Sequence, residues 1–159
     1  MRNKPQEDKS TQSYAYYTKM IMGMRQAKIR GEVIVAKPVL MLTLIEGIEN
    51  GIFTNNRFTL NEWLEQRYLE LMREYTKHSQ FAKPADIANP FWYLTNDGFW
   101  HLQLTTDANT TAAPTRGWLK DNVRYGCFDY DLWELLHNDE WRERLRKYII
   151  EHKLPKDHY

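Results

Sequence analysis

The chain is expected to fold around residues 36–50, which read AKPVLMLTLIEGIEN. Apolar side chains cover nearly every side of a helix drawn over this stretch, at Val39, Leu40, Met41, Leu42, Leu44, Ile45 and Ile48. A helix with so little polar face needs neighbours on most sides, so this one should be the buried central element. Pro38 suits its first position, and Gly51 suits the left-handed residue just past its end. The stretch is too short to span a bilayer, which takes roughly 20 apolar residues.

Lys37 lies immediately before Pro38, at the expected cap of this helix. A lysine cannot accept the backbone N–H bonds that Ser, Thr, Asp or Asn would accept there. Free N–H groups, the positive end of the helix dipole and the ammonium together would suit an anion such as a phosphate. The alternative is a lysine whose ammonium turns into water, as exposed charges commonly do.

Further helices are expected on both sides of the central one. Upstream, residues 1–13 are polar and should form a disordered tail, followed by a helix over residues 14–29. Downstream, Thr59 and Glu62 match the capping-box pattern, with a hydroxyl at the cap and a carboxylate three residues later. Apolar residues then recur at helical spacing as far as Tyr75, which predicts a long amphipathic helix.

An aromatic segment at residues 90–104, PFWYLTNDGFWHLQL, is expected to form a β-hairpin. Its two apolar runs flank the sequence NDG at 96–98, which is typical of a tight turn. Alternation would place Phe91 and Tyr93 together on one face of the hairpin. That face either covers a neighbouring helix or forms a recognition surface. Because an isolated hairpin is only marginally stable, it should pack on the helices.

The C-terminal part is expected to be mainly helical. A polar loop at 105–114 precedes short helices at 115–122 and 129–137 and a longer helix at 138–153. No repeat or long linker interrupts this order. Residues 14–159 are therefore predicted to form one α+β domain, mostly helical, with its buried central helix at about 37–50 and one β-hairpin at about 91–104.

Composition excludes several classes of protein. The net charge is only +1, so a nucleic-acid site would have to be a local patch. Cys127 is the one cysteine, which rules out an internal disulfide and favours a reducing compartment. The first ten residues are polar and contain no secretory signal, so a cytoplasmic protein without a membrane span is expected.

No residue pattern predicts an enzyme. The five histidines are scattered and Cys127 has no cysteine partner, so neither a metal site nor a cofactor is expected. The chain has no phosphate-binding loop, nucleophile elbow or dinucleotide fingerprint. Cys127 with His101 could be a nucleophile and its base, although a lone buried cysteine is the commoner arrangement. Recognition is the remaining class, and Lys37, the hairpin and Arg116 are its candidates because each suits a phosphate or an aromatic contact.

Six short stretches occur in an order that is typical of a known family. They are Lys37-Pro38 before the apolar helix, NRFTL at 56–60 before a long helix, PFW at 90–92 with NDGFW at 96–100, and RGWL at 116–119 with DEW at 139–141. From about residue 14 to residue 155 the chain resembles the sulfur-binding domain of phosphorothioation-dependent, McrA-like type IV restriction endonucleases. The resemblance implies a module of bacterial restriction-modification and phage defence that binds duplex DNA carrying sulfur in place of a non-bridging phosphate oxygen.

The resemblance also implies the residues of a site. Lys37 would be the cation near the phosphate, and Arg116 would be a second cation. Pro90, with Phe91 and Tyr93 near it, would line an apolar cup. Sulfur is larger, softer and less well hydrated than oxygen, so such a cup favours sulfur, whereas an oxygen entering it would lose its water.

The chain departs from the family pattern at two positions of this site. Ala36 stands where a histidine is frequent, and Asn89 stands where a tyrosine is frequent. Both changes remove contact surface from the cup, so they bear on its specificity for sulfur.

Family members commonly carry a His-Asn-His (HNH) nuclease domain after this one, and the sequence has no such motif. The chain is therefore expected to be at most a recognition subunit, which binds double-stranded DNA and works with a separate nuclease. The alternative is a protein-interaction domain of a defence or mobile-element system that no longer binds DNA. A small enzyme that uses Cys127 is a third hypothesis.

Overall fold

The computed structural model describes residues 5–105 and 114–156. Its helices are α1 (Pro5–Met22), α2 (Ala36–Glu49), α3 (Glu62–Tyr75), α4 (Ala88–Tyr93), α5 (Arg116–Asn122), α6 (Tyr130–Leu136) and α7 (Asp139–Lys153), with a 3-10 helix η1 (Leu94–Asp97) directly after α4. Its strands are β1 (Lys28–Ile29), β2 (Glu32–Val33), β3 (Trp100–Leu104) and β4 (Val123–Phe128), which pair antiparallel as β1–β2 and β3–β4. The α+β class expected from the sequence is confirmed.

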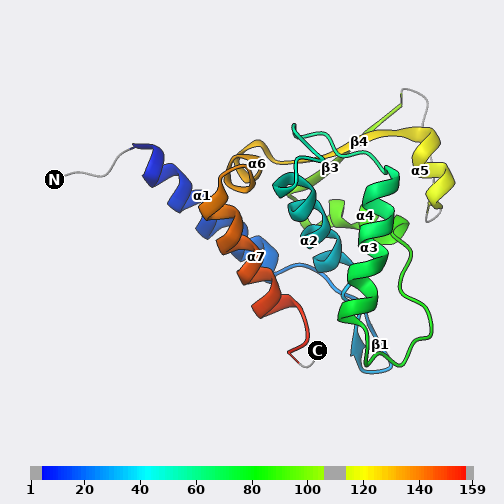
Figure 1. The fold of residues 1–159 in the computed structure, drawn as a ribbon. Helices are drawn as coiled ribbons and strands as arrows, with labels where there is room; N and C mark the ends of the chain where they lie inside the picture. The colour runs from blue at the N-terminus through cyan, green and yellow to red at the C-terminus, as the bar shows by residue number, and fades with distance from the viewer. Residues whose placement is uncertain (1–4, 106–113, 157–159) are drawn as a thin grey trace.

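The buried central helix is α2, as the sequence predicts. Eleven of its 14 residues are buried, and it lies between α7 and α3 (Figure 1). It ends as expected, because Gly51 adopts a left-handed φ of 75°. Its start differs from the prediction, since Val35 is the cap and Ala36 the first helical residue. Lys37 therefore lies within the first turn of α2 rather than at its cap.

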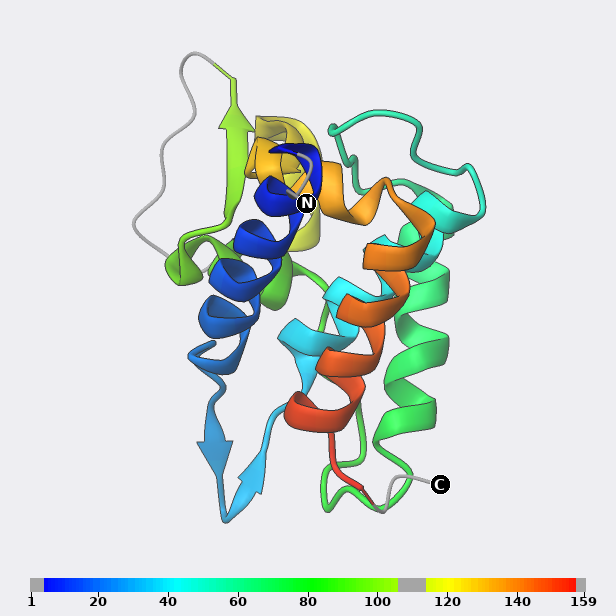
Figure 2. The same cartoon turned by 90° about the vertical axis from the view of Figure 1, so that its left-hand side faces the viewer.

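The first helix starts and ends earlier than expected. The helix predicted over 14–29 instead spans Pro5–Met22, so residues 5–13, which were assigned to a tail, are helical. The chain then turns back at Arg30 and Gly31, both with positive φ (52° and 85°), and this turn joins β1 to β2. Two left-handed residues in a two-residue turn match the twist of a hairpin. Figure 2 shows this short hairpin projecting from the helical body.

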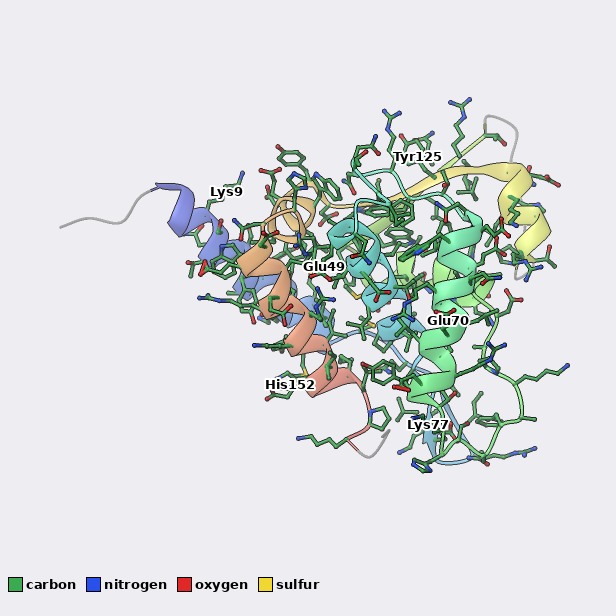
Figure 3. All side chains as sticks on the ribbon, viewed as in Figure 1. Lys9, Glu49, Glu70, Lys77, Tyr125 and His152 are labelled. Atoms are coloured by element: carbon green, nitrogen blue, oxygen red, sulfur yellow. The ribbon has the colours of Figure 1, made fainter. Side chains whose placement is uncertain are left out.

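The helix α3 forms where the sequence predicts it, but its cap is a different residue. Asn61 rather than Thr59 is the cap, and its side chain accepts the backbone N–H of Leu64 at 2.8 Å. The polar face of α3 points away from the core, and Glu70 on it is seen at the outer surface (Figure 3).

The hairpin predicted at about 91–104 is wrong in its first half. This half forms α4 and η1, and only the second half is a strand, β3. The Asp86 carboxylate accepts the N–H of Ala88 at 2.8 Å and so supports the start of α4. Pro90 falls within the first turn, where a missing N–H is tolerated. Aromatic side chains can be buried equally well on a helix and on a strand. The aromatic content of this segment therefore does not distinguish a helix from a strand. Gly98, with φ 92°, ends η1 and leads into β3.

The partner of β3 is β4, a strand that the sequence analysis does not predict. Trp100 of β3 opposes Phe128 of β4, and both side chains are buried. Gly126 of β4 exchanges two backbone hydrogen bonds of 2.8 Å with Phe58 on its other side. The rings of Phe58, Trp100 and Phe128 pack with centroids 5.0 to 5.9 Å apart, which closes this end of the core.

The three C-terminal helices, α5, α6 and α7, confirm the helices expected after residue 115. Asn138 caps α7 by accepting the N–H groups of Glu140 and Trp141 at 3.0 Å. The polar loop predicted at 105–114 lies almost entirely outside the described residues. Within the described part of the chain, no helix is both long and apolar enough to cross a membrane.

Candidate functional site

A cavity of about 680 Å³ lies where the start of α2 meets α4. The β1–β2 hairpin, the end of α3 and the loop between α3 and α4 complete its walls. Three of the five residues implied for the site, Lys37, Pro90 and Tyr93, line it, and so do Ala36 and Asn89, the two positions that depart from the family pattern. Residues more than fifty positions apart in the sequence therefore meet in one cavity.

The walls of this cavity are apolar over much of their area and basic at a few points. Apolar side chains come from five segments and include Ile34, Ala36, Met72, Phe81 and Pro84. Three cationic residues line the cavity, Arg25, Lys37 and Lys83, against a single acidic residue, Glu32. This combination suits an anion that also presents a poorly hydrated surface.

Lys37 does not hold a free charge in this cavity. Its Nζ donates to Oδ2 of Asp97 at 2.7 Å, and the two side chains are only 13% and 3% exposed. The other carboxylate oxygen, Oδ1, accepts the backbone N–H of Arg25 at 2.9 Å. Asp97 thus joins η1, α2 and the segment after α1, and it holds the ammonium at the cavity wall. The sequence alone predicts either an anion-binding or a solvated Lys37, and this partner, sixty residues away, is not evident from it.

The helix α4 supplies the wall opposite Lys37, and its residues divide between cavity and core. Asn89, Pro90 and Tyr93 line the cavity. Tyr93 is 38% exposed to solvent. Phe91 does not line it, because its ring is buried and packs edge-on against Trp100 at 5.4 Å. The carbonyl of Phe91 also accepts the indole N–H of Trp100 at 2.9 Å. Phe91 therefore anchors α4 to the sheet, while Asn89, Pro90 and Tyr93 line the cavity.

Two further contacts, which the sequence analysis did not identify, hold the outer walls. The hydroxyl of Tyr68 donates to the carbonyl of Ala85 at 2.9 Å, and burial raises the pKa of this phenol well above its usual value. Glu32 of β2 accepts hydrogen bonds from the hydroxyl of Ser79 and the backbone N–H of Gln80, which lower its pKa. These bonds tie the loop after α3 both to α3 and to the β1–β2 hairpin.

Arg116, the second cation implied for the site, lies on α5 and does not line the cavity. Its Nε contacts Oε1 of Glu65 at 3.0 Å, and Lys120 contacts the other carboxylate oxygen at 2.7 Å. Thr115 caps α5 through the N–H of Trp118. The ring of Trp118 meets that of Trp92 at 5.7 Å, so α5 packs directly on α4, behind the cavity wall.

Comparison with known proteins identifies the family. Residues 18–157 match the family described as ScoMcrA-like, DNA sulfur-binding domain. The chain belongs to this family. No protein of curated function matches the sequence.

The fold of the chain is similar to that of solved sulfur binding domains. One is described as the sulfur binding domain of ScoMcrA complexed with phosphorothioated DNA, with a TM-score of 0.66, 20% identity and coverage of 89% of this chain and 90% of that chain. Another is the sulfur binding domain of SprMcrA complexed with phosphorothioated DNA, with a TM-score of 0.64, 14% identity and coverage of 91% and 87%. At these identities the likeness concerns the fold.

A further group of titratable side chains lies near the start of β3. Nε2 of His101 contacts Oδ1 of Asp129 at 2.6 Å, and the hydroxyl of Tyr17 donates to Oδ2 at 2.9 Å. Cys127 is the cross-strand neighbour of His101. Among the described residues, no group of three or more His, Cys, Asp or Glu side chains could hold a metal ion.

The Cys127 thiol is expected to react slowly with alkylating reagents. Burial raises its pKa, and the Asp129 carboxylate raises it further, so at pH 7.5 less of it is thiolate than in a free cysteine. The rate of reaction with iodoacetamide at pH 7.5 should be several-fold below that of an unstructured cysteine peptide and should rise with pH up to an elevated midpoint. A rate above that of the peptide would contradict the expectation and would favour the nucleophile hypothesis.

Proposed function

We propose that this sulfur-binding domain is a DNA-binding module that takes a phosphorothioate of a duplex backbone into the cavity between α2 and α4. The observation that carries the proposal is the convergence of Lys37, Pro90 and Tyr93 on one largely apolar cavity. Family membership supports it, as do the descriptions of two relatives of similar fold, both as complexes with phosphorothioated DNA.

The apolar walls give sulfur its advantage over oxygen. A non-bridging oxygen would have to leave its water behind without gaining a hydrogen bond from Pro90 or from the aliphatic walls, and that loss is costly. A sulfur atom loses less water and gains dispersion contacts with the same carbon atoms. Ala36 and Asn89 are smaller than the histidine and tyrosine frequent in the family, and Tyr93 and the neighbouring Phe81 would supply apolar surface in their place.

Lys37 would act on the phosphate while it stays bonded to Asp97. An ammonium has three N–H donors, and Asp97 uses one of them. The two others remain for the non-bridging oxygen of the same phosphorothioate. The sulfur can then enter the apolar part of the cavity while the Lys37 ammonium at the cavity wall balances the charge of the phosphate. Asp97 fixes the direction of the ammonium, which reduces the entropy lost when the ligand binds.

The proposed module recognises DNA and does not cut it. Burial and the Asp129 carboxylate raise the pKa of the Cys127 thiol, which disfavours a nucleophile there. Cleavage of a recognised duplex would therefore be supplied by a separate nuclease, and the module would work in the cytoplasm, where DNA is accessible.

The proposal predicts a preference for sulfur that depends on the cavity. In fluorescence anisotropy at one fixed salt concentration, a labelled duplex with a single phosphorothioate of defined stereochemistry should bind at least tenfold more tightly than the same duplex without sulfur. Tyr93→Ala should reduce this ratio, because it removes apolar contact with sulfur. Lys37→Met should weaken binding of both duplexes by about tenfold, since one charge-assisted hydrogen bond to the phosphate is lost.

Two matched variants control this experiment. Tyr130→Ala removes a tyrosine that is 65% exposed on α6, and Lys147→Met removes an exposed lysine of α7, neither of which lines the cavity. Both should bind as the wild type does. Equal binding of the two duplexes by the wild type would refute sulfur recognition, and no binding at all would favour a protein-interaction domain instead.

A further inference from the structure

A smaller hollow, of about 310 Å³, lies between α4, α5, β4 and the residues that lead into α3. Its floor is apolar and includes Phe91 and Leu119, and its rim carries Lys120, Arg124 and Tyr125. No acidic residue lines it. The hollow therefore offers cations and a phenol around an apolar floor, and the carboxylate of Glu65 contacts Lys120 from outside the lining.

The positive charge at this rim is only partly neutralised. Arg57 lies over the ring of Tyr125, with its guanidinium carbon 5.0 Å from the ring centroid. Neither Arg57 nor Arg124 forms an ion pair with a carboxylate within residues 5–105 and 114–156. Lys120 shares Glu65 with Arg116. On a chain whose net charge is +1, these neighbouring cations form a local basic surface.

This basic surface lies close enough to the cavity for one ligand to reach both. Pro90 of α4 lines the cavity, and Phe91 of the same helix lines the hollow. A six-residue helix is only about 9 Å long. Figure 1 shows α5 and the loop before α4 at the right of the molecule, with α4 behind α3, and Figure 3 shows Tyr125 in its upper part, near β4. A duplex carries one negative charge per roughly 1.7 Å of its axis, so a duplex seated at the cavity presents further phosphates nearby.

We infer that Arg57, Lys120 and Arg124 form a second contact surface for the sugar–phosphate backbone of the duplex whose phosphorothioate occupies the cavity. This inference rests on the proposed function. The stacking of Arg57 on Tyr125 limits the freedom of the guanidinium, so less entropy is lost when it meets a phosphate. Contacts of this kind add affinity and set the position of the protein on the duplex, but they do not distinguish sulfur from oxygen.

The test is a salt titration of the Arg57→Gln/Arg124→Gln double variant. Anisotropy is measured with the phosphorothioated and the unmodified duplex at several salt concentrations. The affinity for both duplexes should fall by the same factor, about tenfold at low salt, and the slope of log K against log salt should become shallower by about 1.8, or 0.9 for each phosphate contact. The ratio between the two duplexes should stay at its wild-type value.

The control is Arg144→Gln/Lys147→Gln, which removes two exposed charges from α7, on the other side of the molecule (Figure 1). It matches the test variant in charge, and Arg144 also lies over an aromatic ring, that of Trp141 at 4.6 Å. Its salt slope should equal that of the wild type. If the test variant keeps the slope of the control, or changes the ratio between the duplexes, the inference is overturned.

The same measurements separate this inference from the proposed function. If the wild type binds both duplexes equally and the double variant still has a shallower slope, the basic surface contacts DNA and the sulfur cup is refuted. If the wild type prefers sulfur and the double variant has the wild-type slope, the cup stands and the basic surface does not contact DNA. If the wild type binds neither duplex, both are refuted.

Discussion

Gly126→Ala should destabilise the domain by about 3 kcal/mol, at the upper end of what overpacking of a core usually costs. A Cβ at position 126 would lie 2.2 Å from Cζ2 and 2.5 Å from Cη2 of Trp100, far inside contact distance. Trp100 cannot move away easily, because its indole N–H is bonded to Phe91 and its ring is packed between Phe58 and Phe128. The backbone of Gly126 is equally confined by its two hydrogen bonds to Phe58. Urea unfolding followed by tryptophan fluorescence measures the loss.

Gly117→Ala is the matched control for this substitution. Gly117 lies in α5, and a Cβ there would meet nothing closer than the Thr115 hydroxyl at 3.9 Å. Alanine is favoured over glycine in a helix, so this variant should be unchanged or slightly more stable. If Gly126→Ala were as stable as Gly117→Ala, the close packing of β4 on Trp100 would be disproved.

Asp97→Ala is expected to cost about 3 kcal/mol of the free energy of unfolding at pH 7, the lower end of the range for breaking a buried ion pair. The Lys37 ammonium would lose its partner in a site where only 13% of its side chain meets solvent. The N–H of Arg25 would also lose its acceptor. Asp97→Asn should retain part of the stability, because an amide oxygen can still accept one of these hydrogen bonds.

The control for this prediction is an exposed pair of the same charge type. Glu74 contacts Lys77 at 3.3 Å, and about half of each side chain is exposed, so Glu74→Ala should cost under about 0.5 kcal/mol. Chemical unfolding of the three variants beside the wild type gives the comparison. If Asp97→Ala lowered the free energy of unfolding by no more than Glu74→Ala does, the prediction would be contradicted. The Lys37 ammonium would then be hydrated when Asp97 is absent.

The helices could be predicted from the sequence because the evidence for them is local. The apolar run of α2 and the spacing of apolar residues in α3 are each readable within a few turns. The aromatic run of α4 was misassigned because apolar content without a clear period fits a helix or a strand equally. The strand β4 was missed because its partners, β3 and Phe58, are distant in the sequence.

In the candidate site, too, some features could be predicted from the sequence, whereas contacts between residues distant in the sequence could not. The resemblance placed Lys37, Pro90 and Tyr93 in one site, and the structure brings all three to one cavity. The Asp97 partner of Lys37 is sixty residues away, and Tyr68 reaches Ala85 across seventeen, so no local pattern reveals either contact. Phe91 and Tyr93 were expected to share a face, as strand residues do, whereas the helical turn of α4 sends one to the core and the other to the cavity.

Under the proposed function, the position of Lys37 in α2 would link ligand occupancy to the stability of the whole domain. The residues that follow it, from Pro38 to Ile45, are all buried, so the end of α2 that holds Lys37 cannot unfold alone without opening the core. A ligand held by this lysine would then bind only the native state, and saturation at one hundred times its dissociation constant would raise the free energy of unfolding by about 2.7 kcal/mol. Thermal denaturation of the domain therefore becomes an assay for its ligand that requires no label on the DNA.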